Sequence, residues 1–229
     1  QATNLMLGCE NAADHLSHFY LFFMPDFTRP GYAGRAWHAE VQRRFSALSG
    51  EHVRRALSAR QRWFELMGTL GGKWPHTHSI APGGSSRAID AAERLRLLTL
   101  VREFRAFLEE VMLGGDDIDA VLALDSEAAL ARWHAQDPQR GDLRLWLTVA
   151  ADTGMDGLGR GPGRWLSYGG WPQPDGRLGV ARGLWDAAAG RLLPLDLAAI
   201  AEDASSAWMA GGDARHPFDG LTQPEPDKA

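Results

Sequence analysis

Three residues near the start of the chain, Asp14, His15 and His18, are of types that could carry chemistry. His15 and His18 are three positions apart, so on a helix they would share a face and could bind one metal ion. Asp14 and one of the imidazoles could instead form a proton relay near neutral pH. A histidine pair on an amphipathic helix, without a third ligand at a recognisable spacing, is also typical of hydrogen-bonded core residues. The pattern alone favours this structural interpretation.

The loop around His76 is the second candidate. Residues 73–78 read KWPHTH, and glycine pairs on both sides of the surrounding segment allow the backbone to approach another surface closely. Pro75 restricts the backbone before His76, and an imidazole held in such a loop can hydrogen-bond or transfer a proton. A rigid structural turn, with Trp74 as a core anchor and His78 in solvent, explains the pattern equally well. We expect no regular element in this segment, because two prolines also interrupt it.

The elements that must position these residues are mainly helices. Apolar residues at helical spacing predict a buried helix over residues 3–24, stopped by Pro25. Ser86 or Asp90 opens a long amphipathic helix that ends at the glycine pair 114–115. The other predicted helices occupy residues 35–50, 51–70, 116–124, 126–136 and 142–151.

The chain changes character after Thr153. Residues 157–195 are rich in Gly, Pro and Trp, and short alternating runs predict a small antiparallel sheet with turns at 174–176 and 189–190. A short helical piece is expected at 200–209. The expected fold class is therefore mainly α (α+β), a long-helix bundle with a small antiparallel β insert. The expected domains, all parts of one larger domain, are a helical portion (1–156), the β-rich insert (157–195) and a return segment (196–229).

Composition excludes several classes of partner. The 229 residues carry a net charge of −5, with 24 basic residues scattered among 29 acidic ones, so no basic stripe is present to bind nucleic acid. The longest apolar stretch, residues 16–24, is broken by Ser17 and His18 and is too short to cross the ~30 Å hydrocarbon layer of a membrane. The chain begins at Gln1 without an initiator methionine or a leader, which is typical of an excerpt or a processed chain.

Three further groups of residues are expected to have structural roles. Cys9 is the only cysteine, which excludes an internal disulfide or a C-x-x-C site, and we expect it to be a buried, inert thiol. Asp116, Asp117 and Asp119 resemble a charge cluster at a helix N-terminus, where carboxylates complement the macrodipole. Eight tryptophans are expected to serve packing or a subunit interface: Trp37, Trp63, Trp133, Trp146, Trp165, Trp171, Trp185 and Trp208.

Four segments of the chain, in this order, resemble the large, catalytic subunit of nickel-iron hydrogenases. They read ENAADHLSHFYLFFMPDF (10–27), GGKWPHTHSIAPGG (71–84), IAEDASSAWM (200–209) and HPFDGLTQP (216–224). The family carries a helix with a D-H-x-x-H-F-Y core, a glycine-bracketed P-H loop, a strand-rich insert, an I-x-E-x-x-x-x-S-W-like segment and an H-P-x-x-G-x-T-x-P motif. One such motif alone would be weak, whereas four in the family's order are specific.

The resemblance implies the fold of the large subunit, the oxidation or sensing of H2, and an iron-sulfur small subunit as partner. It also implies a nickel-iron centre whose iron carries CO and cyanide. Asp14 would be an aspartate near this centre, and His76 a histidine near both the active site and the small-subunit interface. Both would handle protons, because H2 cleavage releases a proton that positioned carboxylates and imidazoles can take away. His15 and His18 would support them.

Two variant stretches favour the hydrogen-sensing, regulatory type within this family. Residues 21–25 (LFFMP) follow the His-Phe-Tyr triplet, where uptake enzymes usually continue with H-L-H, and residues 72–76 read GKWPH. Regulatory hydrogenases are cytoplasmic and pass a signal to a histidine kinase. A cytoplasmic location and a kinase partner are therefore expected for this protein.

The departures from the family concern the metal ligands. The family holds its metals with four cysteines in two C-x-x-C motifs; this chain has neither motif, and Cys9 matches no ligand position. We therefore expect the middle fragment of a longer subunit, with the ligands outside it and no metal bound by the fragment alone. Two alternatives stay open: a non-catalytic large-subunit paralogue that acts as an assembly scaffold, and a freestanding helical binding module.

Overall fold

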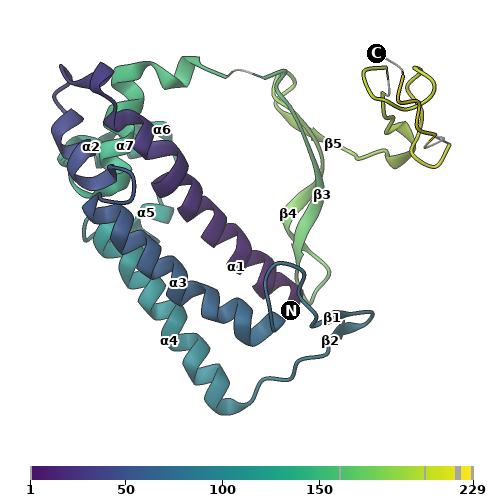
Figure 1. Ribbon diagram of the computed structural model, residues 1–229, viewed down its shortest axis with the longest axis horizontal. Coiled ribbons are helices and arrows are strands. Elements are labelled where there is room, and N and C mark those ends of the chain that lie inside the picture. Colours follow the sequence, from purple (N-terminus) through teal and green to yellow (C-terminus); the bar gives the residue numbers. More distant parts are fainter. Residues whose placement is uncertain (1, 160, 204, 220–222, 228–229) are drawn as a thin grey trace. The chain divides into compact units, whose positions relative to one another are not determined.

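A computed structural model describes residues 2–159, 161–203, 205–219 and 223–227. The chain divides into two compact units, Gln1–Leu158 (unit 1) and Gly159–Ala229 (unit 2). Unit 1 is helical and unit 2 carries a small antiparallel sheet, which confirms the predicted fold class (Figure 1). The domain boundaries expected at residues 156 and 195 stay a prediction.

The first helix, α1 (Ala2–Ser17), buries one stripe of side chains at spacings of three and four residues. It continues without a break into a π-helical turn, η1 (His18–Phe23), and then into a 3-10 helix, η2 (Met24–Thr28), whose first turn contains Pro25. The helix predicted from the apolar spacing is confirmed, but its last turn is π rather than α. Tyr20, in the middle of that turn, is fully buried.

The long helices of unit 1 lie side by side. α3 (Glu51–Gly71) packs against both α1 and α4 (Ala91–Phe107), as Figure 1 shows. Asp90 rather than Ser86 opens α4, because its side chain accepts a hydrogen bond from the Glu93 amide in a capping box. Unit 1 also contains η3 (Pro30–Tyr32), α2 (His38–Phe45), the π-helical η4 (Leu108–Met112), α5 (Ile118–Leu122), α6 (Glu127–Gln136), α7 (Gly141–Thr153) and η5 (Met155–Gly157).

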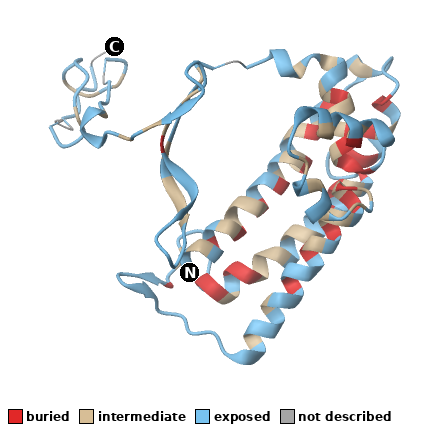
Figure 2. Ribbon diagram, turned by 180° about the vertical axis from the view of Figure 1, so that it is seen from behind, coloured by how far each residue is buried: buried red, intermediate tan, exposed pale blue. Residues whose placement is uncertain are grey.

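Two clusters of buried apolar side chains hold these helices together. The larger cluster includes Tyr20, Phe45 and Leu145, which come from η1, α2 and α7. The smaller cluster includes Met6 and Leu66, which join α1 to α3. Figure 2 shows the buried residues gathered on the inner faces of these helices. Among the described residues, every buried apolar side chain belongs to unit 1.

The glycine-bracketed segment at residues 71–84 ends in a small hairpin. β1 (Ile80–Ala81) pairs antiparallel with β2 (Gly84–Ser85). The prediction that this segment forms no regular element is therefore wrong at its C-terminal end. The tight turn is possible because Gly83 and Gly84 adopt φ angles of +89° and +147°, which side chains with a Cβ rarely allow.

Unit 2 contains a three-stranded antiparallel sheet in the order β3-β4-β5. Its strands are β3 (Arg164–Pro172), β4 (Leu178–Asp186) and β5 (Arg191–Leu193). Trp165 lies opposite Trp185, which in turn lies opposite Leu192. The predicted sheet and both predicted turns are confirmed, with Gly176 and Gly190 at φ angles of +83° and +61° in the two turns.

The helical piece predicted at residues 200–209 is wrong. The described residues of this stretch form no helix, and a 3-10 turn, η6 (Leu197–Ala199), lies just before it. Asp203 explains part of the difference, because its carboxylate accepts a hydrogen bond from the Ser205 amide and so competes with helical hydrogen bonding. Ala204, and residues 220–222 of the fourth family-like segment, lie outside the described residues.

The tryptophans fall into two groups. Trp37 and Trp133 are buried and Trp63 and Trp146 are half-buried in unit 1, which confirms a packing role for these four. In unit 2, Trp171 is half-buried; Trp165, Trp185 and Trp208 are exposed, and their place in a subunit interface stays a prediction. None of the described helices combines the length and the apolar character that crossing a membrane would require.

Candidate functional site

The predicted residues Asp14, His15 and His18 are exposed on the side of α1 that faces away from its buried stripe. Together with the half-buried Glu10, these residues form what we call the α1 face. His18 is the first residue of the π-helical turn, and its ring stacks on Phe23 with 6.0 Å between the centroids and 21° between the planes. The interpretation of the two histidines as core residues is therefore wrong, because both are exposed.

Residues 72–79, which we call the histidine loop, are attached to the α1 face through Trp74. The indole Nε1 of Trp74 donates a hydrogen bond to Glu10 Oε1 at 2.6 Å. The edge of the same ring contacts Phe64 of α3, with the centroids 5.1 Å apart. Trp74 remains 48% exposed, so it anchors the loop to the surface of unit 1 rather than to its core. Asp14 lies one helical turn beyond the residue that Trp74 holds.

Hydrogen bonds inside the histidine loop restrict its shape. Thr77 Oγ1 donates to the Gly71 carbonyl at 2.7 Å, and the buried Ser79 accepts a bond from the Ser86 amide through its carbonyl at 2.8 Å. His76 is exposed and has a φ angle of +60°, which is uncommon for a residue other than glycine. The loop therefore presents an imidazole to solvent from a backbone fixed on either side.

The structure attaches the histidine loop to α1 but forms no direct bond among the four predicted site residues. Within the described part of the chain, Asp14, His15, His18 and His76 share no hydrogen bond or ion pair with one another. Their exposure leaves them able to exchange protons with solvent or with a further component. What the arrangement offers is one carboxylate and three imidazoles on a shared, rigid support.

These residues do not fit a metal centre by themselves. The described residues contain no group of three or more His, Cys, Asp or Glu side chains that could hold a metal ion. Cys9 is buried, and its thiol donates to the Trp63 carbonyl with 3.8 Å between sulfur and oxygen. Burial raises the pKa of this thiol to about 11, so it stays protonated near neutral pH. The expected burial of Cys9 is confirmed, and its expected lack of reactivity stays a prediction.

A buried polar cluster that the sequence analysis missed lies behind the α1 face. We call it the Asp142 cluster; it consists of Tyr20, Arg44, His52 and Asp142. The Tyr20 hydroxyl donates to Asp142 Oδ2 at 2.6 Å, and His52 Nδ1 lies 2.7 Å from Asp142 Oδ1. Arg44 NH1 donates to the same Oδ1 at 3.1 Å. One carboxylate thus joins η1, α2, α3 and α7.

Burial keeps the Tyr20 hydroxyl of this cluster protonated. Asp142 and Tyr20 are fully buried, and Arg44 is nearly so. Burial, together with the negative charge of Asp142, raises the pKa of Tyr20 well above its ordinary value, so the hydroxyl remains a hydrogen-bond donor. Arg44 also donates through Nε to Glu40 Oε1 at 2.6 Å, so its guanidinium joins two carboxylates.

One signal in the sequence could have revealed the cluster. Asp142 occupies the same helical stripe as the buried Leu145 and Val149, three and seven positions later. Arg44 is likewise in phase with the buried Val41 of α2. A charged residue in an apolar stripe needs a buried partner, so these two positions predict a buried ion pair, although not which residues form it.

Asp116 is half-buried and pairs with the buried Arg144 rather than belonging to a charged helix end. Its Oδ2 accepts bonds from Arg144 NH2 at 2.7 Å and from Trp133 Nε1 at 2.8 Å. The Arg144 guanidinium also lies over the Trp133 ring, 4.2 Å from its centroid. The predicted N-terminal role holds for Asp117, whose carboxylate accepts bonds from the amides of Asp119 and Ala120.

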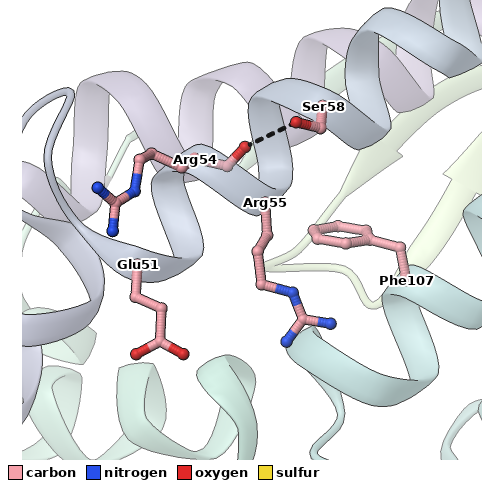
Figure 3. Close-up of a pocket in the computed structure, with 5 residues that line it drawn as sticks. All are labelled: Glu51, Arg54, Arg55, Ser58 and Phe107. Atoms are coloured by element: carbon pink, nitrogen blue, oxygen red, sulfur yellow. Dashed lines mark hydrogen bonds between the residues drawn. The ribbon is translucent and has the colours of Figure 1, made fainter.

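A shallow pocket of about 430 Å³ lies elsewhere in unit 1 and contains none of the predicted site residues. It is lined by Glu51, Arg54, Arg55, Ser58 and Phe107 (Figure 3). Its charged groups are largely engaged, because Arg55 pairs with Glu110 at 2.6 Å and Glu51 pairs with Arg43. We assign it no role in the candidate site.

The fold is similar to that of several solved hydrogenases. The reduced, active Ni-Fe-Se hydrogenase of Desulfomicrobium baculatum matches with a TM-score of 0.67 and 16% identity, over 100% of this chain and 44% of that one. The G491S variant of the [NiFeSe] hydrogenase of Desulfovibrio vulgaris Hildenborough, pressurised with oxygen gas, matches with a TM-score of 0.72 and 18% identity. That match covers 99% of this chain and 42% of the variant's chain. The reduced D. vulgaris Hildenborough enzyme matches with a TM-score of 0.70 and 18% identity, over 100% of this chain and 43% of that one.

These matches concern the fold. This chain spans less than half the length of each of the three hydrogenase chains that it matches. No protein-family model matches the sequence. The similarity extends over both units, so it includes the α1 face, the histidine loop and the sheet of unit 2.

Proposed function

We propose that this chain is a segment of the large, catalytic subunit of a nickel-iron hydrogenase whose intact form oxidises or senses H2. The observation that supports this most strongly is the likeness of fold to Ni-Fe-Se hydrogenases over 99% to 100% of the chain. The four family-like sequence segments, in the family's order, support the same function independently of the fold. The activity belongs to the intact subunit, and we do not expect this segment to be active alone.

Asp14 and His76 are proposed to carry protons to and from the reaction site, with His15 and His18 in support. The exposure of the carboxylate and the imidazoles supports this role, because positioned groups of these types serve as general acids and bases. Trp74 holds the loop of His76 against α1, and this contact supports a joint role for the two elements.

The residues that the structure describes do not fit the nickel-iron centre, so the proposal places its ligands elsewhere. We propose that cysteines outside these 229 residues hold the nickel and the iron with its CO and cyanide. The buried, protonated Cys9 is consistent with that division, because its thiol faces a backbone carbonyl. This chain would then contribute the support around the centre and the groups that move protons.

An iron-sulfur small subunit is proposed as the partner, and the regulatory, hydrogen-sensing type as the class. The sequences LFFMP at 21–25 and GKWPH at 72–76 support this type. Both stretches lie near the α1 face: residues 21–25 extend from the π-helical turn into η2, and residues 72–76 lie in the histidine loop. A cytoplasmic location and signalling to a histidine kinase complete this proposal.

A non-catalytic large-subunit paralogue that acts as an assembly scaffold is the second candidate. The observation that favours it is the lack of a metal-ligating group among the described residues. A scaffold would keep the large-subunit fold while it binds no metal of its own.

The coding frame on both sides of these residues separates the two candidates. The enzyme requires a C-x-x-C motif upstream of Gln1 and a second one near a distant C-terminus. Their presence would support the hydrogenase, and their absence would contradict it and support the scaffold. A protein without either the motifs or a co-purifying iron-sulfur subunit would favour the freestanding binding module.

Purification of the full-length protein with its co-expressed small subunit provides the biochemical test. We expect nickel and iron in the complex and H2-dependent reduction of a redox dye. The contrary result is a complex that carries both C-x-x-C motifs and yet, after incubation with the metals, retains no nickel and reduces no dye. That result would overturn the proposal.

A further inference from the structure

We propose that Asp142 is a positioning residue for His18: acting through Tyr20, it holds the π-helical turn that places the imidazole on the α1 face. Asp142 lies in α7 and does not touch His18, so its effect passes through the backbone of η1. The use of His18 rests on the proposed function, whereas the positioning itself does not depend on which reaction the protein performs.

The stacking of His18 on Phe23 depends on the π geometry. The two residues are five positions apart, and in an α-helix residues with this spacing point about 140° away from each other. A π-helical turn, with hydrogen bonds from residue i+5 to residue i, brings them to the same side. The Met24 amide donates to the Phe19 carbonyl in this pattern, and the rings stack 6.0 Å apart.

A π-helical turn needs support from its surroundings, and Tyr20 provides it. Tyr20 lies in the middle of the turn, is fully buried and donates its hydroxyl to Asp142 at 2.6 Å. His52 and Arg44 hold the Asp142 carboxylate from two other helices, so its position is fixed independently of η1. Asp142 therefore gives the Tyr20 hydroxyl a fixed hydrogen-bond acceptor. This bond holds the Tyr20 side chain, and with it the backbone of the π-helical turn, in place.

A second tether lies at the junction of α1 and the turn. Ser17 Oγ donates to the Ala13 carbonyl at 2.7 Å and accepts a bond from Arg60 Nε at 2.7 Å. Such back-bonding to the preceding turn bends helices. Ser17 and Tyr20 thus bracket His18, whose own side chain is exposed and contacts Phe23.

Nuclear magnetic resonance of the full chain tests this inference, because the ring protons of His18 report the ring current of Phe23. Tyr20→Phe removes the hydroxyl and keeps the packing of the ring. We expect its His18 signals to move at least half of the way toward their positions in Phe23→Leu, where the stacking ring is absent. The signals of His15, which lies in the α-helical part, should stay in place.

Two further variants distinguish positioning from general loosening. Asp142→Asn keeps an oxygen that can accept the Tyr20 hydroxyl, so it should retain most of the wild-type His18 shift, whereas Asp142→Ala should lose it. Asp116→Asn weakens a different, partly buried ion pair of unit 1, the one with Arg144, and should leave His18 unchanged. Wild-type His18 signals in Tyr20→Phe, or an equal displacement in Asp116→Asn, would overturn the inference.

The unmodified protein gives a decisive measurement if a variant does not fold. Nuclear Overhauser contacts between the His18 and Phe23 rings, with a slowly exchanging Tyr20 hydroxyl proton, are expected. The absence of the ring contacts would refute the π-helical positioning. None of these measurements uses H2 or a metal, so their failure would leave the proposed function standing, and an inactive hydrogenase would leave this inference standing.

Discussion

Ionisable side chains in unit 1 occupy two settings that call for different tests. On the α1 face they are exposed, so replacing one should change proton transfer more than stability. In the Asp142 cluster they are buried, so replacing one leaves its partners with unpaired charge or unmet hydrogen bonds. The predictions at this scale use Asp14, His76 and Glu40, each with a control variant.

Asp14→Asn in the full-length protein should lower H2 turnover by at least tenfold while the nickel content stays at the wild-type level. The reason is that the amide cannot take up a proton, whereas an exposed position tolerates the change structurally. Turnover and nickel content are measured on the purified complex. Asp125→Asn, at another exposed aspartate, is the control. Wild-type turnover in Asp14→Asn would remove Asp14 from the site.

His76→Asn should impair H2 turnover or pairing with the small subunit. Asparagine tolerates the left-handed backbone that His76 adopts, so the substitution removes the imidazole without adding strain. His78→Asn, in the same loop and also exposed, is the control and should behave like the wild type. Normal turnover and normal co-purification in His76→Asn would favour a purely structural turn.

Glu40 gives a prediction for the dependence of stability on pH. Hydrogen bonds from Arg43 and Arg44 lower the pKa of this carboxyl from 4.5 to about 2. Since the folded state favours the ionised form, the stabilisation is fully present above about pH 4.5 and is lost as the pH falls through 2. Its magnitude is at most about 3 kcal/mol.

Urea unfolding at several pH values measures this effect. Glu40→Gln should be less stable than the wild type at pH 7, and the difference should shrink toward zero near pH 2. Glu202→Gln, at an exposed glutamate of unit 2, should match the wild type throughout. A difference between Glu40→Gln and the wild type that does not change with pH would contradict the assigned pKa.

At the scale of elements, the N-terminus of α7 and the turn at Gly114 approach each other closely. A Cβ atom at Gly141 would lie 2.6 Å from the Gly114 amide nitrogen, and Gly141 has a φ angle of +69°. This approach positions Asp142, the next residue, for its contacts with Tyr20 and His52. Backbone packing between two glycines therefore sets the geometry of the buried cluster.

Gly141→Ala should be more destabilising than Gly154→Ala by about 1 to 3 kcal/mol. Both glycines have left-handed φ angles, +69° and +66°, but a Cβ at Gly154 meets no atom within 4 Å. Both variants therefore place alanine in a left-handed backbone conformation, but only Gly141→Ala also adds a clash with Gly114. Chemical denaturation measures the difference; equal stabilities would show that the turn can move aside.

At the scale of the whole molecule, the two units differ in how they are held together. Unit 1 has two clusters of buried apolar side chains, whereas the described residues of unit 2 include no buried apolar side chain. The sheet of unit 2 leaves Trp165, Leu166 and Tyr168 of β3 about half exposed. Apolar burial is the main favourable contribution to folding, so unit 2 has little stabilisation of its own.

Hydrogen exchange should therefore show much faster opening of the sheet in unit 2 than of the long helices in unit 1. We expect amides of β3 and β4 to exchange at least a hundred times faster than buried amides of α3, relative to unstructured rates. Mass spectrometry of the full chain measures both. Equal protection in β4 and α3 would show that the sheet is stabilised by contacts other than buried apolar side chains.

The sequence by itself determined most of the segments that form helices and strands. Periods of three to four and of two residues are local signals, so α1, α3, α4 and the β3-β4 hairpin could be predicted from spacing, and the glycine turns from composition. The candidate residues on α1 and in the histidine loop were also found from residue type alone. The helix predicted at 200–209 failed in part because the Asp203 carboxylate bonds to the backbone amide of Ser205.

The tertiary structure alone decided which polar groups meet. Tyr20 and Asp142, which share a hydrogen bond, are 122 residues apart in the sequence. The π-helical turn that contains His18 and Tyr20 has no signature in the local sequence pattern. Exposure of Asp14, His15 and His18 was decided in the same way, by the side of α1 that α3 covers. Periodicity specifies one face of a helix as apolar, but the partner of a buried charge depends on how distant elements pack.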